Sequence, residues 1–323
     1  MKKHLKKIAI TSGDKDGIGF EVVAKALAKV PASVKKNKAV FFVFRHKSQS
    51  ELQPKLFKLL DKRWARKEFS SLDLAMGYLD AELYPDNILI DLVLTTSEAL
   101  WVQQATLACK NKVLTSLVTG PLSKKLTRTL PSKPIGHTGI FRDVFPKKKM
   151  HMAFIGRDFN VLLATDHLPL SAVEAALVGG EFKSALAAGE SLKALLKDKR
   201  RVAVLGLNPH AGEQGLLGNF EKKLFKKLPT SFAGPIVPDA AFLKKNWNNY
   251  SVFVCLYHDQ GLIPFKMHHG QDSGVHVTVG LPFVRTSVDH GTAVDIFNKN
   301  IANPNSMLEA IELNLRLTGD LNV

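Results

Sequence analysis

The feature that most constrains this chain is the alternation, from end to end, of short β-rich apolar runs with stretches of helical periodicity. The runs are residues 7–11, 39–44, 113–119, 152–155, 161–165, 202–207, 251–256 and 275–279. Several are apolar at consecutive positions, which is typical of parallel strands that helices cover on both faces. The pattern therefore predicts an α/β fold with a mostly parallel sheet.

Two helices are predicted from capping patterns. Ser97 can cap a helix that follows it, and Ser306 with Glu309 forms a capping-box pattern near the end of the chain. A length of 323 residues suits about two domains, and without a long linker we expect them to be closely knit.

Charge and cysteine content limit the class of protein. The chain has 45 Lys and Arg against 29 Asp and Glu, a formal charge of +16 that attracts anions. Its basic clusters are dispersed and lack regularly interleaved aromatic residues, so we expect solvated surface charge, with nucleic-acid binding as the alternative. Two cysteines are too few for a disulfide framework. No apolar run reaches the roughly 18 residues that a membrane helix needs. The basic start of the chain is followed by only three apolar residues, 8–10, which is too short for the apolar part of a signal peptide. We expect a cytoplasmic protein without a secretion signal.

Three histidines each follow a separate strand-like run: His167, His210 and His258. In open α/β sheets, ligands bind beyond the carboxyl ends of the strands, so these side chains can converge. Three imidazoles around one divalent cation leave coordination positions open, as in catalytic metal sites. The alternative for each is a surface or hydrogen-bonded histidine.

Polar donors elsewhere suggest an anion site. His137, Thr138, Lys266 and Arg285 can bind a phosphate, although ordinary surface polarity explains each of them singly. The glycine-rich residues 13–19 follow the first strand and open a helix. Their spacing does not match the dinucleotide-binding G-x-G-x-x-G pattern, so a tight strand-to-helix turn is the alternative.

Six stretches together carry a resemblance to a known family. They are residues 13–19, 118–121, 136–138, 206–213, 257–262 and 280–293. In this order they resemble the 4-hydroxythreonine-4-phosphate dehydrogenase (PdxA) family over nearly the whole chain. The resemblance implies two closely knit α/β domains similar to those of isocitrate and isopropylmalate dehydrogenases, with the active site in the interdomain cleft and shared by a homodimer. We expect a cofactor-side domain of residues 1–120 plus 285–323, and a substrate, metal and dimerisation domain of residues 121–284.

The implied activity is an NAD- and metal-dependent oxidation and decarboxylation in pyridoxal 5'-phosphate biosynthesis. It converts 4-phosphooxy-L-threonine, a phosphorylated small molecule, to 3-amino-2-oxopropyl phosphate. The resemblance places one divalent ion, Zn, Mg or Co, on His167, His210 and His258. It places catalytic roles on His210, Asp239 and Lys266, and substrate contacts on His137, Thr138, Lys266, His276 and Arg285. NAD or NADP would contact Gly17, Gly19, His290, Gly291, Thr292, Ala293 and Asn303.

Two departures from the family pattern leave the substrate open. Gly139 stands where the family has a glutamate, and His276 stands in place of a substrate-binding asparagine. A sister dehydrogenase that oxidises 4-phosphothreonate or 4-phosphoerythronate is therefore the first alternative. A non-catalytic protein that binds anions or nucleic acid is the second.

Overall fold

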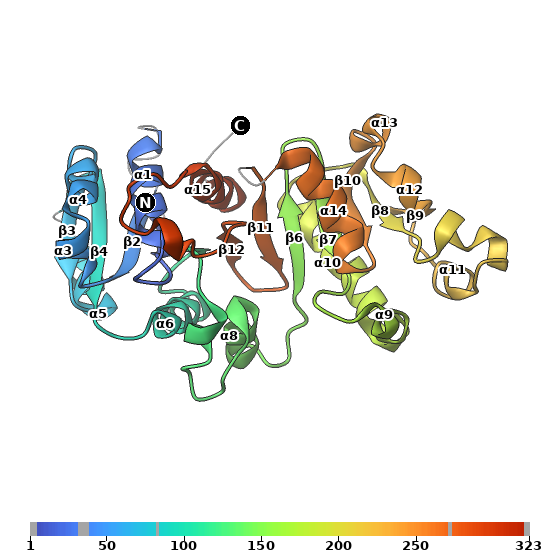
Figure 1. Ribbon diagram of the computed structural model, residues 1–323, viewed down its shortest axis with the longest axis horizontal. Coiled ribbons are helices and arrows are strands. Elements are labelled where there is room, and N and C mark those ends of the chain that lie inside the picture. The colour runs from blue at the N-terminus through green and yellow to red at the C-terminus, as the bar shows by residue number, and fades with distance from the viewer. Residues whose placement is uncertain (1–4, 32–38, 82–83, 271–272, 320–323) are drawn as a thin grey trace. The chain divides into compact units, whose positions relative to one another are not determined.

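The computed structural model describes residues 5–31, 39–81, 84–270 and 273–319, and the chain forms two compact units (Figure 1). The first is Met1–Lys148 with Leu281–Val323, and the second is Lys149–Gly280. The expected boundaries were 120 and 284. The segment after residue 120 joins the first unit because helix α8 (Gly136–Val144) packs against helix α6 (Glu98–Lys110).

The first unit contains six parallel strands in the order β3-β4-β2-β1-β5-β12. They are β1 (Lys6–Thr11), β2 (Ala39–His46), β3 (Ala65–Phe69), β4 (Ile88–Leu94), β5 (Ser116–Thr119) and β12 (Val284–Ser287). Every residue of β5 is buried and only the last of β2 is not, so both faces of these strands are covered. The remaining elements are α1 (Gly19–Lys29), α3 (Gln49–Leu52), α4 (Pro54–Asp61), α5 (Leu72–Asp80), α7 (Lys124–Thr127), η3 (Val294–Ile296) and α15 (Asn305–Leu317).

The second unit contains strands in the order β11-β6-β7-β10-β8-β9. They are β6 (His151–Ile155), β7 (Asn160–Leu163), β8 (Arg201–Leu205), β9 (Phe232–Ile236), β10 (Tyr250–Cys255) and β11 (Val275–Val279). The β11/β6 and β6/β7 pairs are antiparallel, whereas β7, β10, β8 and β9 pair in parallel. The helices are α9 (Leu170–Ala176), η1 (Leu177–Glu181), α10 (Phe182–Leu195), η2 (Pro209–Gly215), α11 (Phe220–Leu224), α12 (Pro238–Ala241), α13 (Lys244–Trp247) and α14 (His258–His269).

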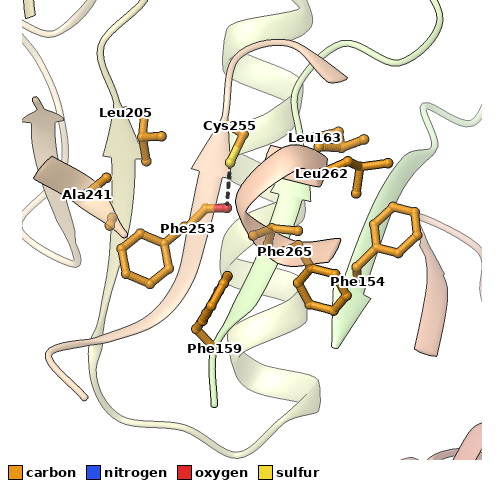
Figure 2. Close-up of a cluster of buried hydrophobic side chains, with 11 residues drawn as sticks. Phe154, Phe159, Leu163, Leu205, Ala241, Phe253, Cys255, Leu262 and Phe265 are labelled. Atoms are coloured by element: carbon orange, nitrogen blue, oxygen red, sulfur yellow. Dashed lines mark hydrogen bonds between the residues drawn. The ribbon is translucent and has the colours of Figure 1, made fainter. Parts of the chain in front are cut away.

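An aromatic core fixes helix α14 on the strands of the second unit (Figure 2). Phe265 from α14, Phe154 from β6 and Phe159 from the β6–β7 turn pack together with Phe253 of β10. The rings of Phe159 and Phe265 meet edge to face at 5.8 Å. Burial of each such ring contributes several kcal/mol, so α14 has a well-defined position on this sheet.

The predicted α/β fold with a mostly parallel sheet is confirmed. All eight predicted strands are present within a few residues, but β3, β4, β9 and β12 were not predicted. The capping box of Ser306 and Glu309 is wrong, because α15 begins at Asn305 and Ser306 Oγ instead accepts from Asp289 N at 3.2 Å. In the part of the chain that the structure describes, no helix has the length and apolar character needed to cross a membrane.

Candidate active site

Arg285 occupies a fully buried position in the first unit. It lies on strand β12 with 1% of its surface exposed, and its Nη2 donates to Thr119 Oγ1 at 2.5 Å. The guanidinium carbon lies 5.2 Å from the centre of the Phe141 ring, on helix α8. Burial lowers the pKa of Arg285 to about 9. A group with this pKa is still protonated at neutral pH, so Arg285 holds a buried positive charge.

His137 and Thr138 occupy the first turn of helix α8, whose N-cap residue Ile135 provides no side-chain cap. Burial, and then the positive charge of Arg285, lower the pKa of His137 well below its ordinary value, so the imidazole is neutral. Its Nε2 atom is shielded from solvent and makes no hydrogen bond with any residue that the structure describes. A neutral imidazole, a hydroxyl, a buried cation and the N-terminal end of a helix form a donor set for an anion.

Gly139 lies on the same turn and is tightly packed. A Cβ atom built on it would lie 2.8 Å from Pro134 Cβ, closer than real Cβ contacts. Pro134 therefore occupies the space that a side chain at residue 139 would need. The departure from the family's glutamate is therefore accompanied by a local packing that excludes a larger residue unless Pro134 moves.

The predicted cofactor residues lie beside the start of helix α1. Ile18 N donates to Thr292 O at 3.0 Å, and a Cβ on Gly17 would lie 2.8 Å from this same oxygen. A Cβ on Gly19 would lie 1.7 Å from Ser12 O, so both glycines are required by backbone packing alone. The structure thus brings together the two loops that the resemblance selected.

The loop from His290 to Ala293 has features that suit a ligand. Within residues 5–31, 39–81, 84–270 and 273–319, no group bonds the shielded Nε2 atom of His290, and a Cβ on Gly291 would meet nothing within 4 Å. Ala293 adopts a left-handed conformation with φ of 44°. Asn303 follows Ala302, whose backbone N donates to Glu21 Oε1 of α1 at 2.8 Å.

Two of the three predicted metal ligands meet in the second unit. The rings of His167 and His258 lie with centroids 5.1 Å apart. His258 Nδ1 is 2.7 Å from Asp259 Oδ1, which directs the lone pair of Nε2 away from the carboxylate. No ring contact among the described residues joins His210 to this pair, and the ligand atoms of the three do not all lie within 4.8 Å of one another. A site completed by all three histidines stays a prediction.

His210 lies in an unusual turn. From His210 to Gln214 every residue has positive φ, including four non-glycine residues with φ between 44° and 54°. Each such residue costs on the order of 1–2 kcal/mol, and strain of this kind clusters at functional sites. His210 itself projects from the surface, with 66% of its side chain exposed.

Buried Glu221 and Gln260, neither of which was predicted, hold the segment before this turn. Glu221 Oε1 accepts from the amides of Leu207 and Asn208 at 2.9 and 2.8 Å, and Oε2 accepts from Asn208 Nδ2 at 3.0 Å. Gln260 Nε2 donates to Gly206 O at 2.8 Å. Glu221 precedes a run of lysines in the sequence, and nothing local marks it as a buried acceptor.

The remaining predicted residues of the second unit are Asp239, Lys266 and His276. Asp239 is exposed on helix α12, which packs against the turn of His210. Lys266 is exposed on helix α14, two turns after His258. His276 is half-buried on β11, where its ring stacks on Phe154 with centroids 5.1 Å apart.

Residues 95–314 match the family described as "Pyridoxal phosphate biosynthetic protein PdxA". A 4-hydroxythreonine-4-phosphate dehydrogenase of Sulfurihydrogenibium sp. is 32% identical to this chain, over 96% of this chain and 98% of its own length. The crystal structure of 4-hydroxythreonine-4-phosphate dehydrogenase from Klebsiella pneumoniae is 25% identical, with a TM-score of 0.75 over 97% of this chain and 99% of that chain. A β-decarboxylating dehydrogenase from Thermococcus kodakarensis shares the fold, with a TM-score of 0.52 at 12% identity over 97% and 84% of the two chains.

Proposed function

Because the chain belongs to the PdxA family of pyridoxal phosphate biosynthesis, we propose that it is an NAD- or NADP-dependent 4-hydroxythreonine-4-phosphate dehydrogenase. The reaction oxidises the C3 hydroxyl of 4-phosphooxy-L-threonine and releases CO2, giving 3-amino-2-oxopropyl phosphate. The observation that carries the proposal is the pair of buried, charged Arg285 and neutral His137, which lies within the matched residues.

In this proposal, Arg285, His137 and Thr138 hold the phosphate of the substrate. Water screens a buried guanidinium weakly, so its attraction to a phosphate is stronger than that of a surface arginine. His137 Nε2, which has no hydrogen-bond partner among the described residues, can donate to the same anion. Binding energy from the phosphate then orients the reacting carbon.

We propose that His167, His210 and His258 hold the divalent metal. The arrangement of His167, His258 and Asp259 fits such an ion, because a carboxylate beside Nδ1 orients a metal-binding imidazole. A bound dication supplies Lewis-acid stabilisation of negative charge on the reacting oxygen. Imidazole ligands suit Zn²⁺ or Co²⁺ better than Mg²⁺.

Three further residues complete the proposed substrate and catalytic set. Lys266 adds a positive charge on the helix that begins with His258. Asp239 supplies an acidic group on the helix that packs against the turn of His210. His276 stands in place of the family's asparagine, and its imidazole can still donate one hydrogen bond.

NAD or NADP, which accepts the hydride, would bind Gly17, Gly19, His290, Gly291, Thr292, Ala293 and Asn303. The packing of the two loops on each other and the shielded Nε2 of His290 support this assignment. The proposal also includes a homodimer that shares its active site, as the family resemblance implies. A cytoplasmic location fits the free, buried thiols of Cys109 and Cys255.

The packing at Gly139 favours a second candidate, a sister enzyme that oxidises 4-phosphothreonate or 4-phosphoerythronate. The glutamate of the family is absent, and Pro134 occupies the space near the missing side chain. An anion pocket altered in this way would accept a phosphorylated acid that lacks the amino group.

The test is an assay of NADH formation with the purified protein, Zn²⁺ or Co²⁺, and each substrate in turn. Turnover of 4-phosphooxy-L-threonine supports the proposal, whereas turnover of the amino-free acids alone identifies the sister enzyme. His210→Ala should abolish metal-dependent turnover, and His46→Ala, at a histidine that instead bonds Ser48, should not. Activity of His210→Ala after metal stripping would contradict the metal assignment. No turnover, combined with salt-sensitive DNA or RNA binding, would favour a nucleic-acid-binding protein.

A further inference from the structure

A second group of metal-ligating side chains lies at one end of the second unit. Asp158 belongs to the turn between β6 and β7, and His268 and His269 form the end of helix α14. One ligand atom from each lies within 4.8 Å of the other two. No other trio of His, Cys, Asp or Glu in the described residues meets this condition.

The separations fit a metal ion after a small contraction. His268 Nε2 and Asp158 Oδ2 are 2.7 Å apart. Zinc bonds to nitrogen and oxygen are about 2.0–2.2 Å, so ligand atoms around one ion lie no more than about 4.4 Å apart. Because all three atoms lie within 4.8 Å of one another, no separation exceeds this limit by more than about 0.4 Å. Small rotations of the half-buried carboxylate and of the two rings bring the atoms to bonding distance.

The hydrogen bonds of His269 prepare it to be a ligand. Its Nδ1 lies 3.1 Å from Phe265 O, and a donated hydrogen there leaves the lone pair on Nε2. A backbone carbonyl commonly orients a metal-binding histidine in this way. The Nε2 atom accepts only a long bond of 3.3 Å from Asp158 N. Gly156 leaves the space for this atom, since a Cβ there would lie 2.4 Å from it.

Aromatic packing fixes both imidazoles before any ion binds. The ring of His268 lies 4.2 Å from Trp247, and the ring of His269 lies 4.4 Å from Phe265 and 4.8 Å from Phe159. Phe159 and Phe265 belong to the core shown in Figure 2. The side chain of His268 is still 33% exposed, so an ion can reach it from solvent. Ligands held by packing lose little entropy on binding.

We propose that Asp158, His268 and His269 form a binding site for a transition-metal dication such as Zn²⁺, distinct from the three histidines assigned to catalysis. Two imidazoles and one carboxylate suit Zn²⁺, Ni²⁺ or Cu²⁺ and disfavour Mg²⁺ and Ca²⁺. On binding, the ring of His268 exchanges with water to the tautomer that carries its hydrogen on Nδ1, and Nε2 and the Asp158 carboxylate then bond to the ion in place of each other. The ion joins the β6–β7 turn to the end of helix α14.

The positive charge of Arg157 lies beside the proposed site and should weaken its affinity for a metal cation. Its Nη2 lies 3.4 Å from Asp158 Oδ2, and its side chain is largely exposed. A cation at this distance competes with a metal for the same carboxylate. Replacing Arg157 with glutamine should therefore tighten metal binding by about two- to ten-fold, and a site elsewhere on the chain would not respond.

The experiment uses the full chain with His167→Ala and His210→Ala, which removes the proposed catalytic ligands. We expect one Zn²⁺ to bind by calorimetry, and Cu²⁺ to quench the fluorescence of Trp247, which touches His268. Adding Asp158→Asn and His269→Gln should weaken binding by about 100-fold or more and remove the quenching. His46→Gln is the matched control, because it removes a half-buried histidine from the other unit.

Circular dichroism establishes that each variant is folded, and Zn²⁺ should raise the Tm of the double-alanine chain but not of the chain that also lacks Asp158 and His269. The proposal is overturned if the double-alanine chain binds no Zn²⁺. It is also overturned if Asp158→Asn with His269→Gln leaves the affinity unchanged, or if only His46→Gln lowers it. None of these results depends on dehydrogenase activity, so the proposed function can fail or hold independently.

Discussion

Replacing Arg285 with methionine should make the unliganded protein more stable and the enzyme inactive. Burial lowers the pKa of Arg285 to about 9, and this fall from the ordinary arginine pKa corresponds to a desolvation cost of ~5 kcal/mol. Against this, the variant loses contacts that include the hydrogen bond to Thr119 and the contact with the Phe141 ring, these two together worth about 2–3 kcal/mol. Thr119 Oγ1 still has Ser287 Oγ at 3.1 Å. We expect a net gain of at most about 2 kcal/mol.

The assay compares urea unfolding of both proteins, with and without inorganic phosphate. Phosphate should stabilise the wild type and not Arg285→Met, because an anion offsets the buried charge only where that charge exists. The KM for the phosphorylated substrate should rise by about 100-fold or more, since a buried partner of an anion contributes 2–5 kcal/mol or more.

Arg45→Met is the matched control, because Arg45 is equally buried but serves the fold. Its Nε and Nη2 bind Asp91 Oδ1 and Oδ2 at 2.7 and 2.9 Å. Removing it leaves a buried carboxylate with one fewer partner and should destabilise the protein by about 3–5 kcal/mol. The two substitutions thus have opposite predicted signs. If Arg285→Met destabilises the chain as Arg45→Met does, the charge of Arg285 belongs to the fold and the phosphate site must lie elsewhere.

Three further predictions concern packing, pH and the turn of His210. Phe253→Ala, in the fully buried core of Figure 2, should lower the free energy of unfolding by about 3–5 kcal/mol in urea titrations, and a loss below 1 kcal/mol would refute the packing described. Burial raises the pKa of Cys109 to about 12; its stabilising contribution is complete below the unfolded thiol's pKa of about 8.5 and is lost as pH rises toward 12. Between pH 7.5 and 10 the wild type should therefore lose about 2 kcal/mol more stability than Cys109→Ala, and equal losses would argue against this burial. Glu221→Gln should weaken the affinity for the activating metal by about 10–100-fold while the protein stays folded, because Glu221 positions the segment before His210. An unchanged metal concentration at half-maximal activity would show that Glu221 does not position His210.

Local sequence patterns predicted those parts of the fold that local patterns determine. Apolar runs located eight strands, and the rule for carboxyl ends of strands placed His167 beside His258. Strand β12, with the sequence VRTS, carries no such signal. It is a strand because β5 pairs with it, and Arg285 is buried because helix α8 covers it. Both causes come from residues distant in sequence, which a single-sequence pattern does not contain.

The turn of His210 is a second feature that local sequence patterns do not predict. Residues 210–214 contain one glycine, yet all five adopt positive φ. Local preference disfavours this conformation, and buried Glu221 fixes the segment before it from another element. Local rules therefore fail at the two places where the chain carries a local cost, the desolvated charge of Arg285 and the left-handed turn. Natural sequences retain such costs chiefly at functional sites, so these failures support the same residues that the family resemblance selects. The unliganded protein should therefore gain stability from substitutions at either place that abolish its activity.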